Sequence, residues 1–480
     1  MNYSWLCLKR FYGPLPRSLK NVWGSPSGIA NTLQGTLSAT SLDAGKMAEE
    51  IFKTFKGENF AKQREELNEY IKKFGIANYK QFLNNHINDW NTYPLRIAVS
   101  ESSGQGKSSL INTLRGLKPT SDGAAQVCTV ECTHDVAEYS DPKHPNLIYY
   151  DLPGVGTPNF PSAEYFNIIK NKTKDNIEFK DFDFFLILSA DRFTEEDVWL
   201  AKHINKGGKQ FYFIRTKIDN DLRNSYEDYP DNYNEENTLE TIRKKCLEEL
   251  IKLNLRTTES IDIDWSKKIF LLSTKFAHSN KWNFPQMITS LVKDYPSLKR
   301  EAIIISITAN CKDIIREKVN VLRNRIWMFA LANCLGGVVP IPGASVAADL
   351  AVVGAALFTY KQNLGLDDES LKILAESYNV TVGTIELQLA SSAVYSAYFV
   401  GGDLAKHAIA DGSEQLLKRL TNEAITYFPF LGAIVGGGLS FGTTYYQLDQ
   451  MLNDLEQAAF DVLHYVTRAS SKQQPYHDEL

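Results

Sequence analysis

The chain has 480 residues, of which 43% are hydrophobic and 23% charged, and its formal net charge is −5 at pH 7. This composition is globular and excludes disordered, collagen-like and coiled-coil chains, while the length predicts two or three domains. The near balance of charge argues against bulk nucleic-acid binding. The 6 cysteines include no Cys-x-x-Cys pair, so we expect unpaired thiols in a reducing compartment.

The two ends of the chain read as tails. Residues 1–45 contain Lys and Arg but no acidic residue before Asp43, and they are rich in Ser, Gly, Pro and Thr. We interpret them as a disordered tail, with a mitochondrial presequence in residues 1–42 as the less favoured alternative. The tail 469–480 ends in the ER-retrieval tetrapeptide HDEL, which we take as a coincidence because nothing precedes it that would deliver the chain to the lumen.

The body of the chain changes character twice. Residues 46–92 have apolar side chains at helical spacing and predict two or three amphipathic helices. Residues 93–297 alternate helical segments with strand-like runs, which predicts an α/β domain with a parallel-rich, helix-covered sheet. Residues 298–468 predict helices alone, in an all-helical domain that also gathers the N-terminal helices. The strand-like runs lie at 95–100, 146–152, 182–190, 209–217 and 267–274.

A phosphate-binding loop follows the first strand, in the sequence ESSGQGKS of residues 101–108. In a strand–loop–helix unit, glycines let backbone N–H groups surround phosphate oxygens, and the helix N-terminus adds a positive dipole. Lys107 supplies a cation for the β- and γ-phosphates, and the Ser108 hydroxyl is a ligand for Mg²⁺. We expect the nucleotide to contact Ser103, Gly104, Gln105, Gly106, Lys107, Ser108 and Ser109.

The strand that ends near residue 152 carries a second motif, Asp151-Leu-Pro-Gly154. The Asp151 carboxylate is placed to hold Mg²⁺, usually through water, and the Gly154 N–H to contact the γ-phosphate. Lys107 and Gly154 are therefore the predicted catalytic groups at the phosphate end.

Two further motifs predict a purine site. Thr216-Lys217-Ile218-Asp219 closes the fourth strand, and its Asp219 carboxylate can accept from the N1–H and N2–H₂ of guanine, which adenine does not supply. Lys217 can lie along the ring, and Ser273-Thr274-Lys275 closes the last strand, where backbone N–H groups support the guanine O6. Four signals in this order predict GTP or GDP with Mg²⁺ and argue against an adenine-using enzyme.

These motifs and the stretches around them resemble the immunity-related GTPases, the interferon-inducible family. The resemblance covers about residues 80–300 and continues more weakly into 322–330 and 364–386. It implies a Ras-like GTPase domain on a helical domain built from both chain ends, GTP-dependent self-assembly that accelerates hydrolysis, and action at intracellular membranes. It is carried by GQGKSSLINTLRGL (104–117), GAA (123–125), VECT (130–133), YDLPGVGTPNFP (150–161), LSADRF (188–193), FYFIRTKIDND (211–221) and IFLLSTK (269–275).

The chain departs from the family pattern in the loop and in the first switch segment. Glu101 stands where the family has the first loop Gly, so its carboxylate adds bulk and repels phosphate unless it swings outward. Val127-Cys128 replaces the family's switch Thr-Gly and removes the usual magnesium hydroxyl. Thr129 or Thr133 is the substitute if the loop shifts.

The chain also lacks the residue that usually orients the attacking water. Ras-like enzymes commonly use a Gln directly after the motif glycine, and this chain has Val155 there. By the resemblance, Glu131 is the candidate that organises catalysis in an assembled interface, and the alternative is a solvated loop carboxylate. We expect a rate per subunit that rises with protein concentration.

Two uncharged segments, 327–348 and 424–448, are long enough to span a membrane. Pro and clustered Gly would break each helix near its middle, so we favour buried helical hairpins. Peripheral or hairpin insertion into a membrane is the alternative, and true spanning is the least favoured.

The motifs predict a protein that hydrolyses GTP with Mg²⁺, and the resemblance implies a dynamin-like immunity-related GTPase that acts in cell-autonomous defence. Its expected partners are further copies of itself, related GTPases and an intracellular membrane surface, and no nucleic acid. We expect it in the cytoplasm, peripheral on ER/Golgi or vacuolar membranes. The alternative is a catalytically weak, guanine-nucleotide-binding regulator of related GTPases, impaired at Glu101 and Val127.

Overall fold

The chain divides into two compact units, each considered by itself. One comprises Asp89–Leu322, Leu357–Asp403 and Gln450–Leu480, and the other Met1–Asn88, Arg323–Ala356 and Leu404–Asp449. The domain boundaries given above stay a prediction. The computed structural model describes residues 65, 69–70, 73, 93–101, 106–127, 136–256, 264–279, 281–296, 299–309, 311–330, 344–391 and 441–473.

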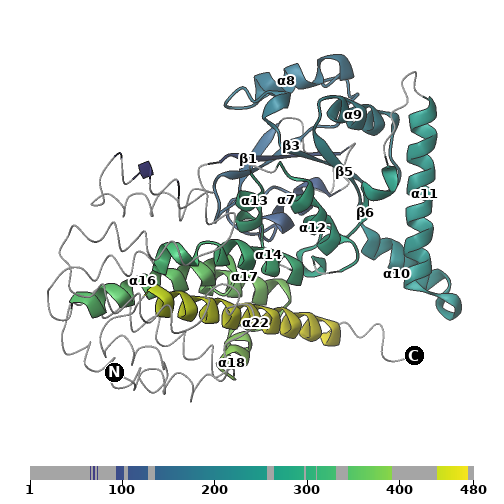
Figure 1. Ribbon diagram of the computed structural model, residues 1–480. Helices are drawn as coiled ribbons and strands as arrows, with labels where there is room; N and C mark the ends of the chain where they lie inside the picture. Colours follow the sequence, from purple (N-terminus) through teal and green to yellow (C-terminus); the bar gives the residue numbers. More distant parts are fainter. Residues whose placement is uncertain are drawn as a thin grey trace. The chain divides into compact units, whose positions relative to one another are not determined.

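Six strands of the first unit form one sheet in the order β2-β3-β1-β4-β5-β6 (Figure 1). β2 is antiparallel to β3, and the other neighbours are parallel, so the predicted α/β class with a parallel-rich sheet is confirmed. β2 is missing from the prediction because its sequence, AEYS, contains no apolar run. The strands are β1 Leu95–Glu101, β2 Ala137–Ser140, β3 Leu147–Leu152, β4 Phe184–Ser189, β5 Gln210–Arg215 and β6 Ile269–Leu271.

The order of the strands reverses at β1, which lies between β3 and β4. Val99 of β1 is level with Asp151 of β3 on one side and with Leu186 of β4 on the other. Ligands of open α/β sheets bind outside the carboxyl ends of the strands at such a reversal. The residues that follow β1, β3, β5 and β6 are therefore placed along one edge of the sheet.

Helices cover both faces of this sheet, with α8 and α9 on one face and α7 and α12 on the other (Figure 1). The helices of this region are α7 Lys107–Leu114, α8 Tyr165–Lys172, α9 Glu195–Lys206, α10 Ile218–Asp228, α11 Glu235–Arg256 and α12 Phe284–Asp294. Short 3₁₀ turns lie at Ser162–Glu164, Phe179–Asp181, Pro230–Asn232, Trp265–Lys267 and Phe276–His278.

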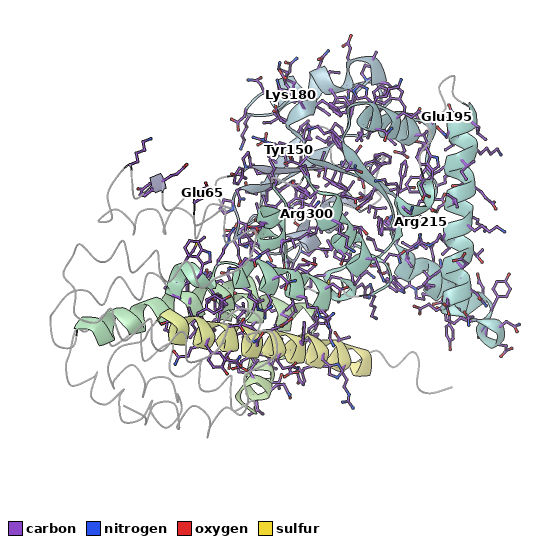
Figure 2. All side chains as sticks on the ribbon, in the orientation of Figure 1. Glu65, Tyr150, Lys180, Glu195, Arg215 and Arg300 are labelled. Carbon is purple, nitrogen blue, oxygen red and sulfur yellow. The ribbon has the colours of Figure 1, made fainter. Side chains whose placement is uncertain are left out.

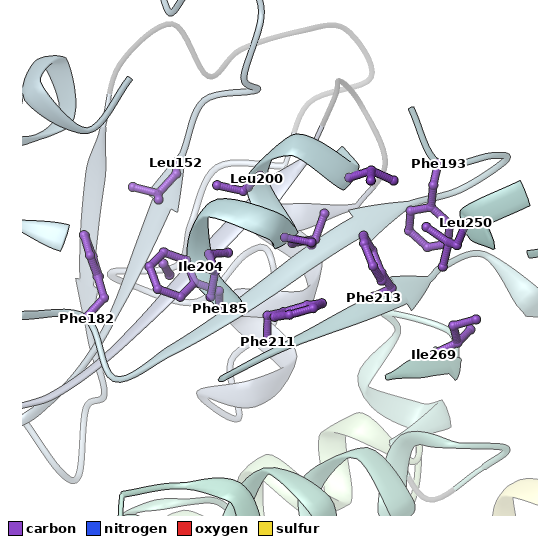
Figure 3. Packing of buried hydrophobic residues seen from close by; sticks show 14 of the residues in the cluster. Leu152, Phe182, Phe185, Phe193, Leu200, Ile204, Phe211, Phe213, Leu250 and Ile269 are labelled. Carbon is purple, nitrogen blue, oxygen red and sulfur yellow. The ribbon is translucent and has the colours of Figure 1, made fainter. Parts of the chain in front are cut away.

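The main core packs between the sheet and the helices α9 and α11 (Figure 3). Successive residues of a strand point to opposite faces, so Phe185 joins this core while Phe184 packs on the other face against Tyr212 and Tyr295. Both faces are buried, which explains why β4 is a continuous apolar run. Members of the core labelled in Figure 3 are Leu152, Phe182, Phe185, Phe193, Leu200, Ile204, Phe211, Phe213, Leu250 and Ile269.

After residue 298, every element in the described part of the chain is a helix, as the sequence predicts. The helices are α13 Arg300–Ser306, α14 Lys312–Arg323, α16 Ala344–Asn363, α17 Asp368–Ser377, α18 Val382–Ser391 and α22 Phe441–Gln473. Because α22 continues to Gln473, the predicted tail 469–480 begins as helix.

Several predictions concern residues outside the described ranges. These include the tail 1–45, nearly all of the helical segment 46–92, the middle of the first apolar segment, at 331–343, and the first part of the second, at 424–440. Within the described ranges, no helix combines the length and the apolar character needed to cross a membrane.

Candidate nucleotide-binding site

The phosphate loop connects β1 to α7, and its last glycine sets the start of the helix. Gly106 is the N-cap of α7 and has a left-handed backbone with φ of 107°. A Cβ atom at this position would lie 3.2 Å from Thr274 Oγ1, so the backbone passes close to the end of β6. Gly is favoured here for both reasons. The predicted phosphate ligands Ser103, Gly104 and Gln105 lie outside the described residues, whereas Ser109 lies in the first turn of α7.

Lys107 is the first residue of α7, and its side chain is buried between the ends of β1 and β3. Its Nζ lies 2.6 Å from Asp151 Oδ1 and donates to the Leu152 carbonyl oxygen at 2.7 Å. The Ser108 hydroxyl donates to Asp151 Oδ2 at 3.5 Å. The structure thus brings together the residues of the first two motifs, because the ends of adjacent parallel strands meet.

The environment of Asp151 suits a cation. Burial raises the pKa of this carboxyl group, and the charge of Glu101 adds to the rise, whereas Lys107 and Ser108 counteract it. A hydroxyl and a carboxylate side by side are the oxygen donors that Mg²⁺ prefers. Ser108 and Asp151 therefore fit the predicted metal site, while the third predicted ligand, Thr133, lies outside the described residues.

Glu101, the last residue of β1, does not swing outward. Its side chain is buried, with 8% of the residue exposed, and its Oε2 accepts a hydrogen bond from the Lys107 backbone N–H at 3.0 Å. This N–H is one of the donors that a phosphate loop offers to its ligand. A carboxylate of the chain itself is therefore bound where phosphate oxygens are expected.

The predicted base site lies at the ends of β5 and β6. Thr216 is fully buried and its N–H donates to the Ser189 carbonyl oxygen at 2.8 Å. Lys217 has a left-handed backbone with φ of 59° and is the N-cap of α10, so Asp219 falls in the first turn of that helix. The strained backbone at Lys217 sets the direction of α10 and thereby the position of the Asp219 carboxylate at the edge of the sheet.

Asp219 is paired with Lys275 across the two strand ends. Lys275 Nζ lies 2.6 Å from Asp219 Oδ2, and the Lys275 N–H donates to Ser273 Oγ at 3.3 Å. Burial alone would raise the pKa of Asp219, but Lys275, with help from Ser273 and His278, holds it below the ordinary value. The carboxylate is therefore ionised at neutral pH, as the recognition of guanine requires.

Comparison with known proteins places the chain in a family. The profile of the family described as Interferon-inducible GTPase (IIGP) matches residues 61–434. The chain belongs to the interferon-inducible GTPase family. The resemblance found in its motifs is thereby confirmed, and GTP hydrolysis is the reaction class of the family to which it belongs.

Individual members of the interferon-inducible GTPase family match over most of their length. Interferon-gamma-inducible GTPase 10 of Mus musculus is 31% identical over 85% of this chain and 91% of that protein. Interferon-inducible GTPase 1 of Mus musculus is 33% identical over 63% of this chain and 68% of that protein. Interferon-inducible GTPase 5 of Rattus norvegicus is 31% identical over 77% of this chain and 74% of that protein.

In this interferon-inducible GTPase, the residue that follows Gly154 of the second motif packs inward. Val155 is partly buried against the core, and an apolar side chain cannot orient water. The next residue, Gly156, has φ of 82°, and a Cβ atom there would meet the Glu196 side chain of α9 at 2.5 Å. The predicted catalytic residue Glu131 lies outside the described residues, and Val127 is 44% exposed.

Two contacts tie the last motif to residues outside it, one of them local and the other between segments far apart in sequence. The ring nitrogen Nδ1 of His278 lies 3.0 Å from Ser273 Oγ, and burial lowers the pKa of this imidazole to about 4. The Thr113 hydroxyl donates to the Thr274 carbonyl oxygen at 2.5 Å, which fastens α7 to the end of β6. The Thr113 contact has no signal in the spacing of residues, because it depends on the packing of α7 beside the end of β6, whereas the His278 contact is local and lies just after β6.

Proposed function

We propose that this family member binds GTP with Mg²⁺ at the carboxyl edge of its sheet and hydrolyses it to GDP and phosphate. The observation that carries the proposal is the convergence of four strand ends. Lys107, which follows β1, lies beside Asp151 at the end of β3, and Asp219 and Lys275 lie together after β5 and β6. The Lys107 ammonium group at one end and an ionised carboxylate at the other match a guanine nucleotide.

Each residue has a distinct role in the proposed reaction. Lys107 holds the β- and γ-phosphate oxygens, and the Gly154 N–H donates to the γ-phosphate. Ser108 and Asp151 hold Mg²⁺, with Thr133 as the proposed further ligand. The ion, when bound, offsets the negative charge of the phosphates. The Asp219 carboxylate accepts from N1–H and N2–H₂ of guanine, Lys217 lies along the ring, and backbone N–H groups of residues 273–275 support O6.

Orientation of the attacking water comes from elsewhere than Val155, which is packed against the core. We propose that Glu131 organises it when two nucleotide-bearing faces of the protein assemble. The rate per subunit then depends on encounter between subunits, and the GTP-bound form is the one that self-associates.

A second candidate function is favoured by the contact of Glu101 with the Lys107 N–H. A chain whose phosphate loop already holds a carboxylate binds nucleotide less tightly. In this case the protein would regulate related GTPases as a catalytically weak partner.

The place of action is proposed from family membership. We infer that the protein works in the cytoplasm, peripherally on ER/Golgi or vacuolar membranes, in cell-autonomous defence, with its own copies and related GTPases as partners. Flotation with liposomes, with and without GTP, tests the membrane part, and failure to float in both states would contradict it.

Turnover against protein concentration separates the two candidates. We expect GTP turnover per subunit to rise over a broad range of concentration and to vanish in Lys107→Ala. A flat specific activity contradicts assembly-dependent catalysis. Activity that arises when a related GTPase is added, with none before, supports the regulator instead.

A further inference from the structure

The buried carboxylate of Glu101 has a function of its own if the proposed nucleotide site is correct. We propose that Glu101 is a built-in competitor of the nucleotide: its carboxylate takes the position of a phosphate oxygen at the Lys107 N–H, and GDP or GTP must displace it to bind. The inference rests on the proposed function and deepens it.

The contact has the chemistry of phosphate binding. The acceptor is an anionic oxygen, Glu101 Oε2, and the donor is the Lys107 N–H at 3.0 Å, the first N–H of α7. N–H groups at a helix N-terminus point outward and favour anions, so a carboxylate can compete with a phosphate for them. The carboxylate is attached to the chain and needs no association step, which gives it a high effective concentration.

The neighbouring charges make the competition stronger. Lys107 Nζ is engaged by Asp151 Oδ1 at 2.6 Å and by the Leu152 carbonyl oxygen at 2.7 Å. The carboxylate of Glu101 acts electrostatically on that of Asp151, so two carboxylates and a single ammonium group lie near the end of β1, and all three residues are at least nine-tenths buried. Each additional phosphate that enters adds negative charge, so displacement of Glu101 matters most for nucleotides with two or three phosphates.

The consequence is a specific pattern of affinities. GMP has no β-phosphate and reaches less of the cradle, so its affinity responds little to the residue at position 101. The affinities for GDP and GTP respond strongly. If Glu101 were only a steric obstacle, Glu101→Gln would bind GDP as weakly as the native chain does, because Gln has the shape of Glu without its charge.

The test is a direct titration of GMP, GDP and GTP, with Mg²⁺ and with a chelator, into the full chain and three variants. Glu101→Gln keeps the shape and a neutral acceptor, Glu101→Gly removes both, and Glu236→Gln is the matched control, since Glu236 is an exposed carboxylate in the first turn of α11. We expect GDP affinity to rise by about threefold or more in Glu101→Gln and about tenfold or more in Glu101→Gly, because a hydrogen bond to a charged group is about twice as strong as a neutral one. Glu236→Gln is expected to match the native chain.

Each outcome has a clear meaning. Equal GDP affinities in the native chain, Glu101→Gln and Glu101→Gly overturn the inference. A loss of GDP affinity in both variants that is confined to the Mg²⁺ titrations also overturns it, because Glu101 would then be a metal ligand. If neither the native chain nor any variant binds a guanine nucleotide while all are folded by circular dichroism, the proposed function itself fails.

Discussion

Lys107 and Asp219, on which the proposed nucleotide site depends, are each paired within the chain. Lys107 Nζ forms an ion pair with Asp151 Oδ1 at 2.6 Å, and Lys275 Nζ forms one with Asp219 Oδ2 at 2.6 Å. The pairs hold both side chains in position before a ligand is bound, which reduces the entropy lost on binding. They also mean that a nucleotide must share or replace an existing contact at each end of the site.

Asp219→Asn tests the proposed recognition of the base. Asn offers one acceptor and one NH₂ donor where Asp offers two acceptors, so contact with guanine N1–H and N2–H₂ is partly lost. We expect GDP affinity to fall about tenfold to a hundredfold, and affinity for xanthosine diphosphate, which has an oxygen in place of the 2-amino group, to rise.

Asp221→Asn is the matched control for this experiment. Asp221 lies on the same turn of α10 but pairs with Arg215 at 2.8 Å, at the end of β5 marked by Arg215 in Figure 2. The Asp221→Asn chain should prefer guanosine over xanthosine nucleotides to the same extent as the native chain. An unchanged preference in Asp219→Asn would remove Asp219 from the base site.

At the scale of single elements, α7 depends on the left-handed turn that precedes it. Gly106→Ala places a Cβ atom on a backbone with φ of 107° and 3.2 Å from Thr274 Oγ1. We expect the free energy of unfolding to fall by about 1–2 kcal/mol from the backbone alone, with a further loss from the contact.

Gly383→Ala is the matched control for Gly106→Ala. Gly383 is exposed in α18 and has open space around it. Ala is the better helix former, so this variant should gain about 0.5–1 kcal/mol. Denaturant unfolding of both variants measures the difference, and a Gly106→Ala chain as stable as the native one would contradict the structure of the loop.

The helix α14 buries a lysine that should give stability a measurable dependence on pH. Lys318 is 2% exposed, and its ammonium group donates to the Ile305 carbonyl oxygen. Burial lowers its pKa from 10.5 to about 7; nearby Asp141 opposes this shift and Lys143 adds to it. Between these two pKa values the folded chain binds fewer protons than the unfolded chain, so stability rises with pH in that window.

Lys318→Met isolates this effect. The contribution of Lys318 amounts to about 1.4 kcal/mol for each pH unit between about 7 and 10.5, and Met has no proton to lose. Denaturant unfolding at several pH values should therefore show a steeper rise for the native chain than for Lys318→Met. Parallel curves would mean that Lys318 titrates near its ordinary pKa in the folded protein.

The elements differ in how far the sequence predicts them. β4 is predictable because burial on both faces demands a continuous apolar run, FFLILS, whereas β2, AEYS, is held by its pairing with β3 and has no local signal. The same division holds in the site. Lys107, Asp151 and Asp219 stand at or just after strand ends in recognisable motifs. Glu101 and His278 contact the Lys107 N–H and Ser273 Oγ through local turns whose geometry no motif encodes.

At the scale of the whole molecule, the order of the strands determines which motifs lie next to one another at the edge of the sheet. β1 is the point of reversal, and the loops after β3 and β5 lie on either side of it. This topology places the phosphate loop between the second motif and the purine motif, so one nucleotide can reach both.

A direct titration of the folded, Mg²⁺-loaded chain with GDP, GTP, ADP and ATP tests the central claim. The ionised Asp219 carboxylate favours guanine because it can accept hydrogen bonds from the N1–H and N2–H₂ groups of this base. Adenine has no donors at these two positions. We predict that guanosine nucleotides bind at least about tenfold more tightly than adenosine nucleotides. Equal affinity for the two, or no binding of either, would contradict the assignment of the site.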